Sequence, residues 1–382
     1  MSVAGASRRR FLAASAGTAG AAWLAPWVRA LSNGSERVPG RAPFIGEGNF
    51  PVDTTIGQGL GRRRALDLSM LSSETLVTPQ EQFFVRTGCP DPLPATTSWK
   101  IRVHGLVKTP SETAVEELKR EAVDQGVHLL ECAGNSRAAH FGFMSAAAWS
   151  GVPLERVLRR VAVSARATQV LVSGFDEHSV LDPGSRPGAS WIFGLDEIRG
   201  SGAFLATAMN GAPLTPDHGY PVRLVVPGWY GCAAIKWVNE IVLVDAEAPA
   251  TDHMREYAGR THQDRASPPR LARDFQPATI DAAALPVRVE KLDAGGRTSY
   301  RIVGIQWGGR SPARNLGIRL NPDLTFAPVE EIGRRRGSTW ALWSHTVRAP
   351  APGRYRIELA VRDPGARTRR LDAGFYAREI AL

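Results

Sequence analysis

The sequence has few cysteines, and those present form no recognisable pair. Among its 382 residues it carries three, which are Cys89, Cys132 and Cys232. An odd number gives no closed disulfide framework, and no two of them have the C-x-x-C spacing of a zinc ribbon, a dithiol redox motif or a c-type haem site. At most one disulfide can form, so at least one thiol is left for another role.

Long apolar runs and clustered basic stretches are also missing. Beyond residue 30 no apolar run reaches the length of a membrane helix, so we expect no membrane anchor. The formal charge is +10, mostly from arginine, but the basic residues are scattered and do not alternate with aromatics. This pattern argues against nucleic acid and favours a small anionic substrate or an acidic protein partner.

The first 30 residues have the pattern of a twin-arginine signal peptide. Arg8 and Arg9 precede Phe11 and Leu12, and an apolar stretch rich in Ala and Gly follows up to Trp27. The alternative is a basic N-terminus before a short helix. Because this route exports proteins already folded, we expect a periplasmic protein that receives a cofactor before export.

The rest of the chain predicts an α+β domain, then a linker and a β-sandwich. Residues 31–78, rich in Gly, Pro, Ser and Arg, are expected to be an arm that wraps a domain. Residues 79–250 mix helical and strand patterns without a regular βαβ repeat, which favours an α+β fold. Residues 251–278 have linker composition, and residues 279–382 contain short strands separated by Gly and Pro turns.

Particular segments carry this prediction. Strands are expected at 99–103, 128–131, 168–174, 221–227, 235–245, 287–292, 299–307, 316–320, 340–347 and 354–361. Helices are expected at 115–122 and 152–161. The strand at 128–131 leads directly into a turn-forming loop that begins with Cys132.

A lone cysteine such as Cys132 is most often an inert, buried, small apolar side chain. Its surroundings favour another interpretation, since it lies at a strand end in a loop with Gly134 and Asn135, and Arg137 follows closely. A neighbouring arginine favours the thiolate, which is the ligand for soft metals. A cysteine hydrolase would need a histidine base beside Cys132, and no histidine is specifically paired with it.

Five motifs in order resemble the sulfite oxidase family. They are Phe83-Phe-Val-Arg86, Glu131-Cys-Ala-Gly-Asn-Ser-Arg137, Met209-Asn-Gly-Ala-Pro-Leu214, Asp217-His-Gly-Tyr-Pro-Val-Arg-Leu-Val-Val-Pro-Gly228 and Lys236-Trp237. The resemblance covers residues 78–260 well. It implies a molybdopterin domain followed by an immunoglobulin-like dimerisation domain, and therefore a homodimer.

The resemblance implies a molybdenum–molybdopterin cofactor with Cys132 as the metal ligand. Positions that match the family's cofactor contacts are Phe84, Arg86, Asp176, His218, Arg223, Ala234, Ile235 and Lys236. Of these, His218 and Arg223 match residues that hold the phosphate end of the pterin. Arginine suits this task because it forms bidentate contacts with phosphate.

For the substrate, the resemblance implies a small oxyanion such as sulfite. Arg86 and Arg137 match arginines of the family's anion pocket, Trp149 matches a pocket tryptophan, and Tyr257 matches the active-site tyrosine. Taken singly, each has a structural alternative. Trp149 fits the core and Arg137 a solvated loop, while Asp217-His218-Gly219 fits a turn with a capping Asp.

The chain departs from the family pattern at two places. The upstream motif usually continues Arg-Asn-His, but here Arg86 is followed by Thr87 and Gly88, so a histidine contact is missing or supplied from elsewhere. Many relatives also carry a C-terminal Asn-Leu-Arg-Gly segment whose arginine reaches the pocket, and no such segment is found between Leu371 and Leu382.

The sequence therefore predicts a molybdopterin-dependent oxidoreductase that oxidises sulfite to sulfate. No cytochrome-b5-like segment is recognised, so electrons are expected to pass to an external acceptor such as cytochrome c. One alternative keeps the cofactor but acts on sulfane sulfur or a sulfoxide. A second alternative is a non-enzymatic exported binding protein, against which the set of Cys132, His218, Arg223 and Lys236 argues.

Overall fold

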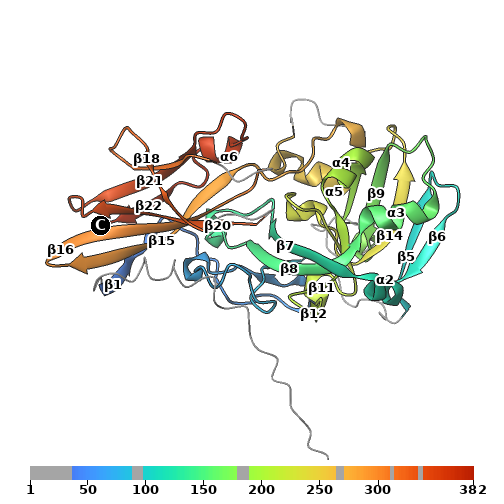
Figure 1. Cartoon of the computed structure of the whole chain (residues 1–382), viewed down its shortest axis with the longest axis horizontal. Coiled ribbons are helices and arrows are strands. Elements are labelled where there is room, and N and C mark those ends of the chain that lie inside the picture. Colours follow the sequence, from blue (N-terminus) through green and yellow to red (C-terminus); the bar gives the residue numbers. More distant parts are fainter. Residues whose placement is uncertain (1–36, 88–97, 179–188, 264–270, 310–313, 334–338) are drawn as a thin grey trace, which may run out of the picture.

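The computed structural model describes residues 37–87, 98–178, 189–263, 271–309, 314–333 and 339–382 (Figure 1). The expected signal peptide, Cys89, Gly88 and the turn at 267–269 lie outside these ranges. Within them the chain forms short helices and four five-stranded sheets, so the expected α+β class is confirmed at this level. No described helix is both long enough and apolar enough to cross a membrane.

Two sheets build the half of the molecule on the right of Figure 1. The first has the order β10-β9-β14-β5-β6, with β10 at Ser190–Gly194, β9 at Gln169–Gly174, β14 at Val238–Val244, β5 at Lys100–Gly105 and β6 at Ser111–Ala114. The second has the order β12-β11-β8-β7 with β13 beside β11, at Ala212–Pro213, Phe204–Met209, Met144–Pro153, Val123–Glu131 and Arg223–Val225 respectively.

Short helices cover these sheets. They are α2 (Val115–Glu121), α3 (Leu154–Leu158), α4 (Leu195–Gly200) and α5 (Asp252–Tyr257). In α2, Glu116 and Glu117 lie in the first turn and Lys119 and Arg120 in the last, which complements the helix dipole. Its Val115 and Leu118 are buried in the core that Ile101 and Val103 of β5 also enter. The alternating pattern seen in the sequence of β5 therefore places its apolar face inward.

Two further sheets pack as a sandwich in the C-terminal half, and their side chains share one apolar core. The first has the order β1-β15-β16-β20-β19, at Arg37–Ala42, Ala283–Ala294, Arg297–Trp307, Ala341–Arg348 and Glu330–Ile332. The second has the order β18-β17-β21-β22-β2, at Ala327–Pro328, Leu316–Leu320, Arg354–Val361, Arg378–Ala381 and Phe44–Ile45. Gly304 of β16 lies opposite Trp343 of β20, and a Cβ at position 304 would come within 2.1 Å of the Trp343 indole.

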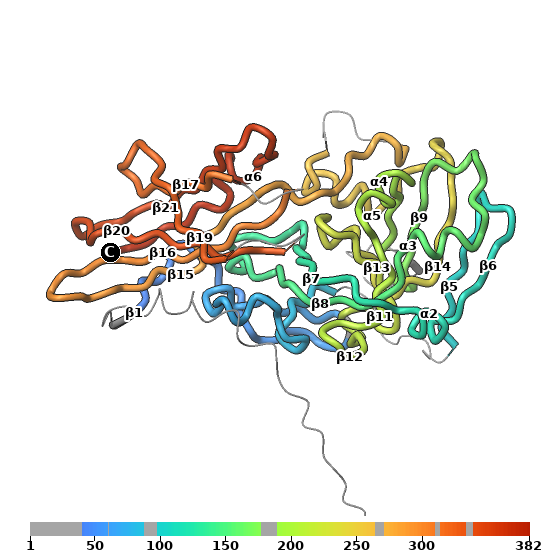
Figure 2. The backbone as a smooth tube through the Cα atoms, viewed as in Figure 1, coloured from blue at the N-terminus to red at the C-terminus, as the bar shows by residue number. Residues whose placement is uncertain are grey.

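The N-terminal arm joins both halves. It adds β1 and β2 to the two sheets of the sandwich and then crosses to the other half, as the blue tube in Figure 2 shows. There β3 (Arg63–Arg64) pairs with β4 (Val85–Arg86), and the N–H of Gly48 donates to the carbonyl of Arg137 at 3.3 Å. The expected arm thus contacts both halves of the molecule.

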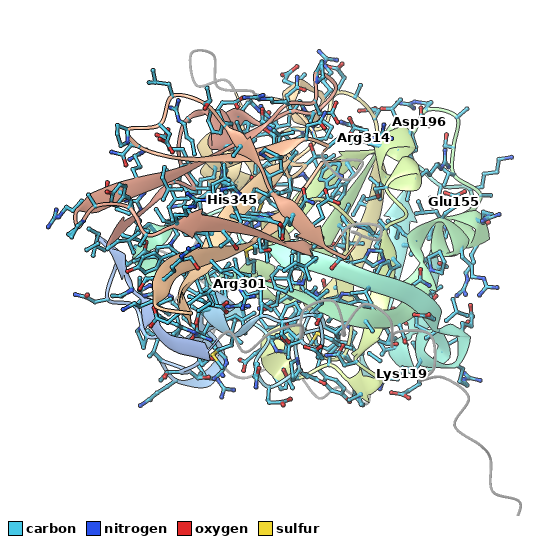
Figure 3. The ribbon with its side chains drawn as sticks, turned by 60° about the vertical axis from the view of Figure 1, so that its left-hand side comes forward. Lys119, Glu155, Asp196, Arg301, Arg314 and His345 are labelled. Atoms are coloured by element: carbon cyan, nitrogen blue, oxygen red, sulfur yellow. The ribbon has the colours of Figure 1, made fainter. Side chains whose placement is uncertain are left out.

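Two segments differ from the sequence prediction. The helix expected over 152–161 begins later, because β8 continues to Pro153; Leu154–Leu158 forms α3, and Arg159–Val161 follows as the 3-10 turn η6. The expected linker is not purely a connection, since α5 and the 3-10 turn η10 (Ala258–Arg260) lie within it. Surface charge is spread over the molecule, and Figure 3 shows side chains such as Lys119 and Asp196 pointing outward.

Candidate cofactor and anion site

Cys132 lies where β7 ends and turns. Its N–H donates to the carbonyl of Phe143 at 2.9 Å, and Asn135 closes the loop by accepting from the N–H of Phe143 at 3.1 Å. The Cys132 side chain is 8% exposed, and its sulfur accepts a hydrogen bond from the N–H of Gly134 at 3.4 Å. The strand end and the turn thus hold the thiol at a fixed, nearly buried position.

Two arginines set the electrostatics of this thiol. Burial raises the pKa of Cys132, and the charges of Arg86 and Arg260 act in the opposite direction. Arg86 is an exposed residue of β4, and Arg260 is an exposed residue at the end of η10. Both cations favour the thiolate that metal binding needs.

Tyr257 of α5 belongs to the same group. Its pKa is raised chiefly by burial, and the charges of Cys132 and Arg86 also act on it. The guanidinium of Arg260 lies 5.5 Å from the centre of its ring. The structure therefore brings Tyr257 and Arg86 together with Cys132, as the sequence predicted, and adds Arg260.

A second group is basic and consists of His218, Arg223 and Lys236. The guanidinium of Arg223 is 4% exposed and donates to the carbonyls of His218 at 3.2 Å and Ala234 at 3.0 Å. Burial lowers the pKa of Arg223 to about 10, and burial with the charges of Lys236 and Arg223 lowers the pKa of His218 to about 3. These groups crowd positive charge into the protein interior.

Gly219 allows this crowding. It ends the 3-10 turn η8 (Pro216–His218) with a φ of 97°, where a Cβ would lie 3.0 Å from the Cβ of Arg223 and 3.1 Å from that of Lys236. A side chain at Gly219 would therefore meet both strain and collision.

The remaining predicted cofactor contacts surround this basic group. Asp176 lies beside the segment that contains Ile235 and Lys236, and Gly174 packs against both. A Cβ at position 174 would lie 2.6 Å from Oδ1 of Asp176 and 2.3 Å from the carbonyl oxygen of Lys236. Ile235 and Ala234 are buried. Phe84 is also buried, in the same group of packed apolar residues as Cys132, and its N–H donates to the hydroxyl of Ser145 at 3.1 Å.

Two short segments join the thiol to the basic group. Arg86 acts on Cys132, and its neighbour Thr87 accepts a hydrogen bond from Lys236 Nζ at 2.6 Å. In the other segment Gly231 lies against the backbone of residues 131 and 132, and the chain then runs through Ala234 to Lys236. One elongated ligand can therefore contact the thiol at one end and the basic group at the other.

The donor set fits a pterin that carries a phosphate. The Nε of Arg223 is buried and has no hydrogen-bond partner in the described structure, although a buried donor without an acceptor is costly. A phosphate beside Arg223 would provide that acceptor and would oppose the charge repulsion on His218. Cys132 supplies a soft ligand at the opposite end.

Two predicted substrate residues have other contacts in the structure. The guanidinium of Arg137 donates to the carbonyl of Ala377 in the C-terminal half. Trp149 is fully buried, lies 5.6 Å from the guanidinium of Arg223, and donates to the carbonyl of His128 at 3.2 Å. It thus contacts Arg223 of the basic group and belongs to the same buried cluster as Cys132.

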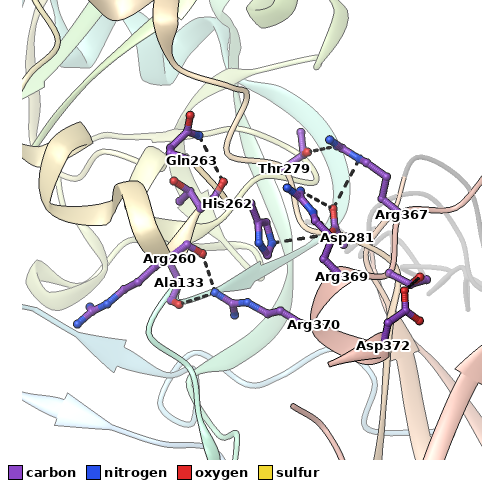
Figure 4. A network of polar contacts seen from close by, with 12 residues as sticks. Ala133, Arg260, His262, Gln263, Thr279, Asp281, Arg367, Arg369, Arg370 and Asp372 are labelled. Atoms are coloured by element: carbon purple, nitrogen blue, oxygen red, sulfur yellow. Dashed lines mark hydrogen bonds and ion pairs between the residues drawn. The ribbon is translucent and has the colours of Figure 1, made fainter. Parts of the chain in front are cut away.

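Sequence reasoning missed the contacts that the C-terminal half makes with the cysteine loop. Arg370 of α6 (Arg369–Asp372) donates to the carbonyls of Ala133 at 3.0 Å and Arg260 at 2.7 Å (Figure 4). The indole of Trp307 donates to the fully buried carboxyl of Glu131 at 2.7 Å. No local motif marks these contacts, since each joins residues more than a hundred positions apart.

Comparison with known proteins identifies the kind of domain that contains these residues. Residues 89–252 match the family model described as oxidoreductase molybdopterin binding domain. Sulfite oxidase from Gallus gallus is 29% identical over 72% of this chain and 64% of its own length. The inducible NADH nitrate reductase 1 of Glycine max is 32% identical over 58% of this chain and 24% of its own length.

Residues 89–252 therefore form a molybdopterin-binding oxidoreductase domain, and the chain resembles sulfite oxidase over most of its length. The expected molybdenum–molybdopterin cofactor is confirmed at the level of the family. In structure, the chain resembles the sulfane dehydrogenase SoxCD from Paracoccus pantotrophus, with a TM-score of 0.64 and 19% identity over 84% of this chain and 80% of that one. That likeness supports the fold.

The match covers only part of the curated relatives. The chain spans about a quarter of the soybean nitrate reductase and less than two thirds of the chicken sulfite oxidase. The roles of the individual site residues stay predictions, to be tested by substitution.

Proposed function

We propose that this molybdopterin-binding oxidoreductase oxidises a small sulfur oxyanion, with sulfite as the first candidate, and passes the electrons to an external acceptor such as cytochrome c. The observation that carries the proposal is the position of Cys132 among Arg86, Arg260 and Tyr257, with an interior basic group within reach of the same ligand. Guanidinium groups beside a metal ligand suit an anion that must approach the metal.

Each part of the site has a distinct task in this proposal. When bound, the molybdenum cofactor supplies the two-electron oxidation chemistry. Cys132 holds the metal, and Arg223 with Lys236 holds the phosphate end. Arg86 neutralises the approaching anion, and Tyr257 keeps its proton because burial raises its pKa, so its hydroxyl is available to donate a hydrogen bond.

A second candidate reaction uses the same cofactor on sulfane sulfur or on a sulfoxide. Two observations motivate this alternative. Arg137 is bonded to Ala377 rather than placed by the thiol, and Thr87, which stands where the family motif has asparagine before its histidine, bonds to Lys236. The anion pocket then carries a different set of cations from the one the family pattern implies.

Three further proposals concern the whole protein. We propose export to the periplasm by the twin-arginine route, supported by Arg8 and Arg9 with the apolar stretch after them. We propose that the C-terminal sandwich is immunoglobulin-like and serves homodimerisation, supported by the family resemblance. The external acceptor is supported by the same resemblance.

The test starts with the protein made in a host that synthesises the cofactor. Metal and pterin analysis should find molybdenum close to one atom per chain, and Cys132→Ser should lose it. Steady-state assays then compare sulfite, a sulfane-sulfur carrier, a sulfoxide and nitrate, each with a suitable redox partner. Protein without molybdenum, together with an unimpaired Cys132→Ser variant, would instead support the non-enzymatic binding protein.

A further inference from the structure

Arg260 contacts the cysteine loop directly. A Cβ built on Gly134 would lie 3.2 Å from Arg260 Nη1 and 3.8 Å from the sulfur of Cys132. The guanidinium therefore rests in space that the loop leaves free only because residue 134 is glycine. Its outer side is open, since Arg260 is an exposed residue.

The position of this guanidinium is fixed from two sides. Its face lies over the ring of Tyr257 at 5.5 Å, an arrangement that attracts a cation to an aromatic ring. The carbonyl of Arg260 accepts from Arg370 Nη2 at 2.7 Å, and the same nitrogen donates to Ala133 of the cysteine loop at 3.0 Å. Figure 4 shows Arg370 bonded to both backbone segments at once.

The arginine expected at this place from the sequence points elsewhere. Arg137 is bonded to the carbonyl of Ala377 in the C-terminal half. Arg260 Nη1 and the sulfur of Cys132 instead both lie within 4 Å of the position that a Cβ at Gly134 would take. The cation that completes the pair with Arg86 thus comes from a segment whose composition indicated only a linker.

We propose that Arg260 is a specificity-determining residue that binds the anionic group of the substrate beside Cys132. The inference rests on the proposed function, because it assumes that the substrate is a small anion at this thiol. It assigns the second arginine of the anion pocket to position 260 rather than 137. The side chain is free to form charge-assisted hydrogen bonds on the face turned away from Tyr257.

The first test measures anion binding by the cofactor-loaded protein without turnover. Inorganic sulfate is titrated by calorimetry into the wild-type protein and into Arg260→Met and Arg260→Lys. Loss of hydrogen bonds to a charged group weakens binding about 10- to 100-fold, so Arg260→Met should bind sulfate that much more weakly and Arg260→Lys should fall between. In turnover, KM for the anionic substrate should rise more than kcat falls.

Arg255→Met is the matched control. Arg255 lies on the neighbouring α5, is exposed, and pairs with Asp252 at 3.0 Å. The Arg255→Met substitution removes one positive charge from the same region but changes no contact with the cysteine loop. The sulfate affinity of this variant should therefore match that of the wild type. Equal sulfate affinity in the wild type and Arg260→Met, or an equal loss in Arg255→Met, would overturn the proposal.

The second test uses the full chain made without the cofactor, so it does not depend on the proposed reaction. Alkylation of Cys132 by anionic iodoacetate and by neutral iodoacetamide is followed by peptide mass spectrometry, which separates it from the other cysteines. The ratio of the two rates removes any general change in thiol reactivity. A cation at a few ångströms favours the anionic reagent about five- to ten-fold, so the ratio should fall by that factor in Arg260→Met and stay unchanged in Arg255→Met.

The two tests separate the two hypotheses. A protein that lacks molybdenum and turns over no sulfur substrate, yet shows the expected alkylation ratio, would sink the proposed function and leave Arg260 as an anion-binding residue. A molybdenum enzyme in which Arg260→Met changes neither sulfate binding nor the alkylation ratio would keep the function and refute the role of Arg260.

Discussion

A buried ion pair between the arm and the C-terminal half offers the sharpest test of how the site is held. Arg378 of β22 and Glu47 of the arm approach at 3.0 Å, with side chains 5% and 8% exposed. Arg378 Nη1 also donates to the carbonyl of Pro286 at 2.9 Å, and its guanidinium lies 3.7 Å from the centre of the Phe44 ring. The same Glu47 carboxylate is 3.7 Å from His140 in the cysteine loop.

Removing one partner should cost far more than the pair contributes as a whole. Arg378→Met leaves the Glu47 carboxylate buried without its counter-charge, and breaking a buried pair in this way costs about 3–5 kcal/mol. For a protein of this size the melting temperature falls about 2 °C for each kcal/mol, so Tm should drop by about 6–10 °C. Burial lowers the pKa of Arg378, and the charge of Glu47 acts in the opposite direction.

The measurement is a double-mutant cycle in denaturant or by calorimetry. Glu47→Gln alone should also destabilise, and the Glu47→Gln/Arg378→Met double variant should lose clearly less than the sum of the single losses. Arg354→Met is the control, because this exposed residue starts the neighbouring strand β21. A single-variant loss below about 1 kcal/mol, or additive losses, would refute the reasoning.

Three further predictions concern the site. Gly219→Ala should cost at least about 1 kcal/mol and lower the molybdenum content, because its φ is positive and its Cβ would meet Lys236; normal metal content would contradict this. Trp307→Phe should cost about 1–3 kcal/mol in urea unfolding, since it removes the shorter of the two side-chain hydrogen bonds to the buried carboxyl of Glu131 and leaves its Oε2 without that donor. The pKa of His218 is about 3 when folded, against 6.5 when unfolded, so cofactor-free protein should lose stability as pH falls from 6.5 towards 3. His218→Gln should flatten that slope, and an unchanged slope would show that His218 is not responsible.

Most strands could be predicted because their local patterns agree with their final environment. The strands expected at 316–320 and 354–361 are β17 and β21 with the same bounds, where alternation and turn residues mark both ends. β8 could not be predicted in this way. Its Ala-rich sequence has low strand propensity, yet it lies between β7 and β11 and is buried on both faces, so small side chains are what the packing requires.

The site residues show the same difference between what local sequence patterns predict and what only long-range packing determines. Cys132, Arg86 and Tyr257 were predicted together because their motifs are recognisable, and the structure gathers them. The guanidinium of Arg137 donates to the carbonyl of Ala377, 240 residues away, a contact that no local pattern predicts, and its role at the thiol stays a prediction. Arg260 lies in a segment whose composition indicates a linker, and only the packing of that segment against Gly134 shows its position.

The cysteine loop is the surface on which the two halves meet, and this has a consequence for how the site can change. The C-terminal half holds the loop through Arg370 at Ala133 and through Trp307 at Glu131, on either side of Cys132. Cys132 therefore lies between two residues, Glu131 and Ala133, that are each held by a side chain of the C-terminal half. A shift of the sandwich relative to the first half would move Cys132 and the carbonyl of Arg260 together, because Arg370 bonds to both segments. Arg370 thus links the loop of the proposed metal ligand Cys132 to the backbone of the proposed anion-binding residue Arg260, so truncating the C-terminal half should lower both anion affinity and metal content.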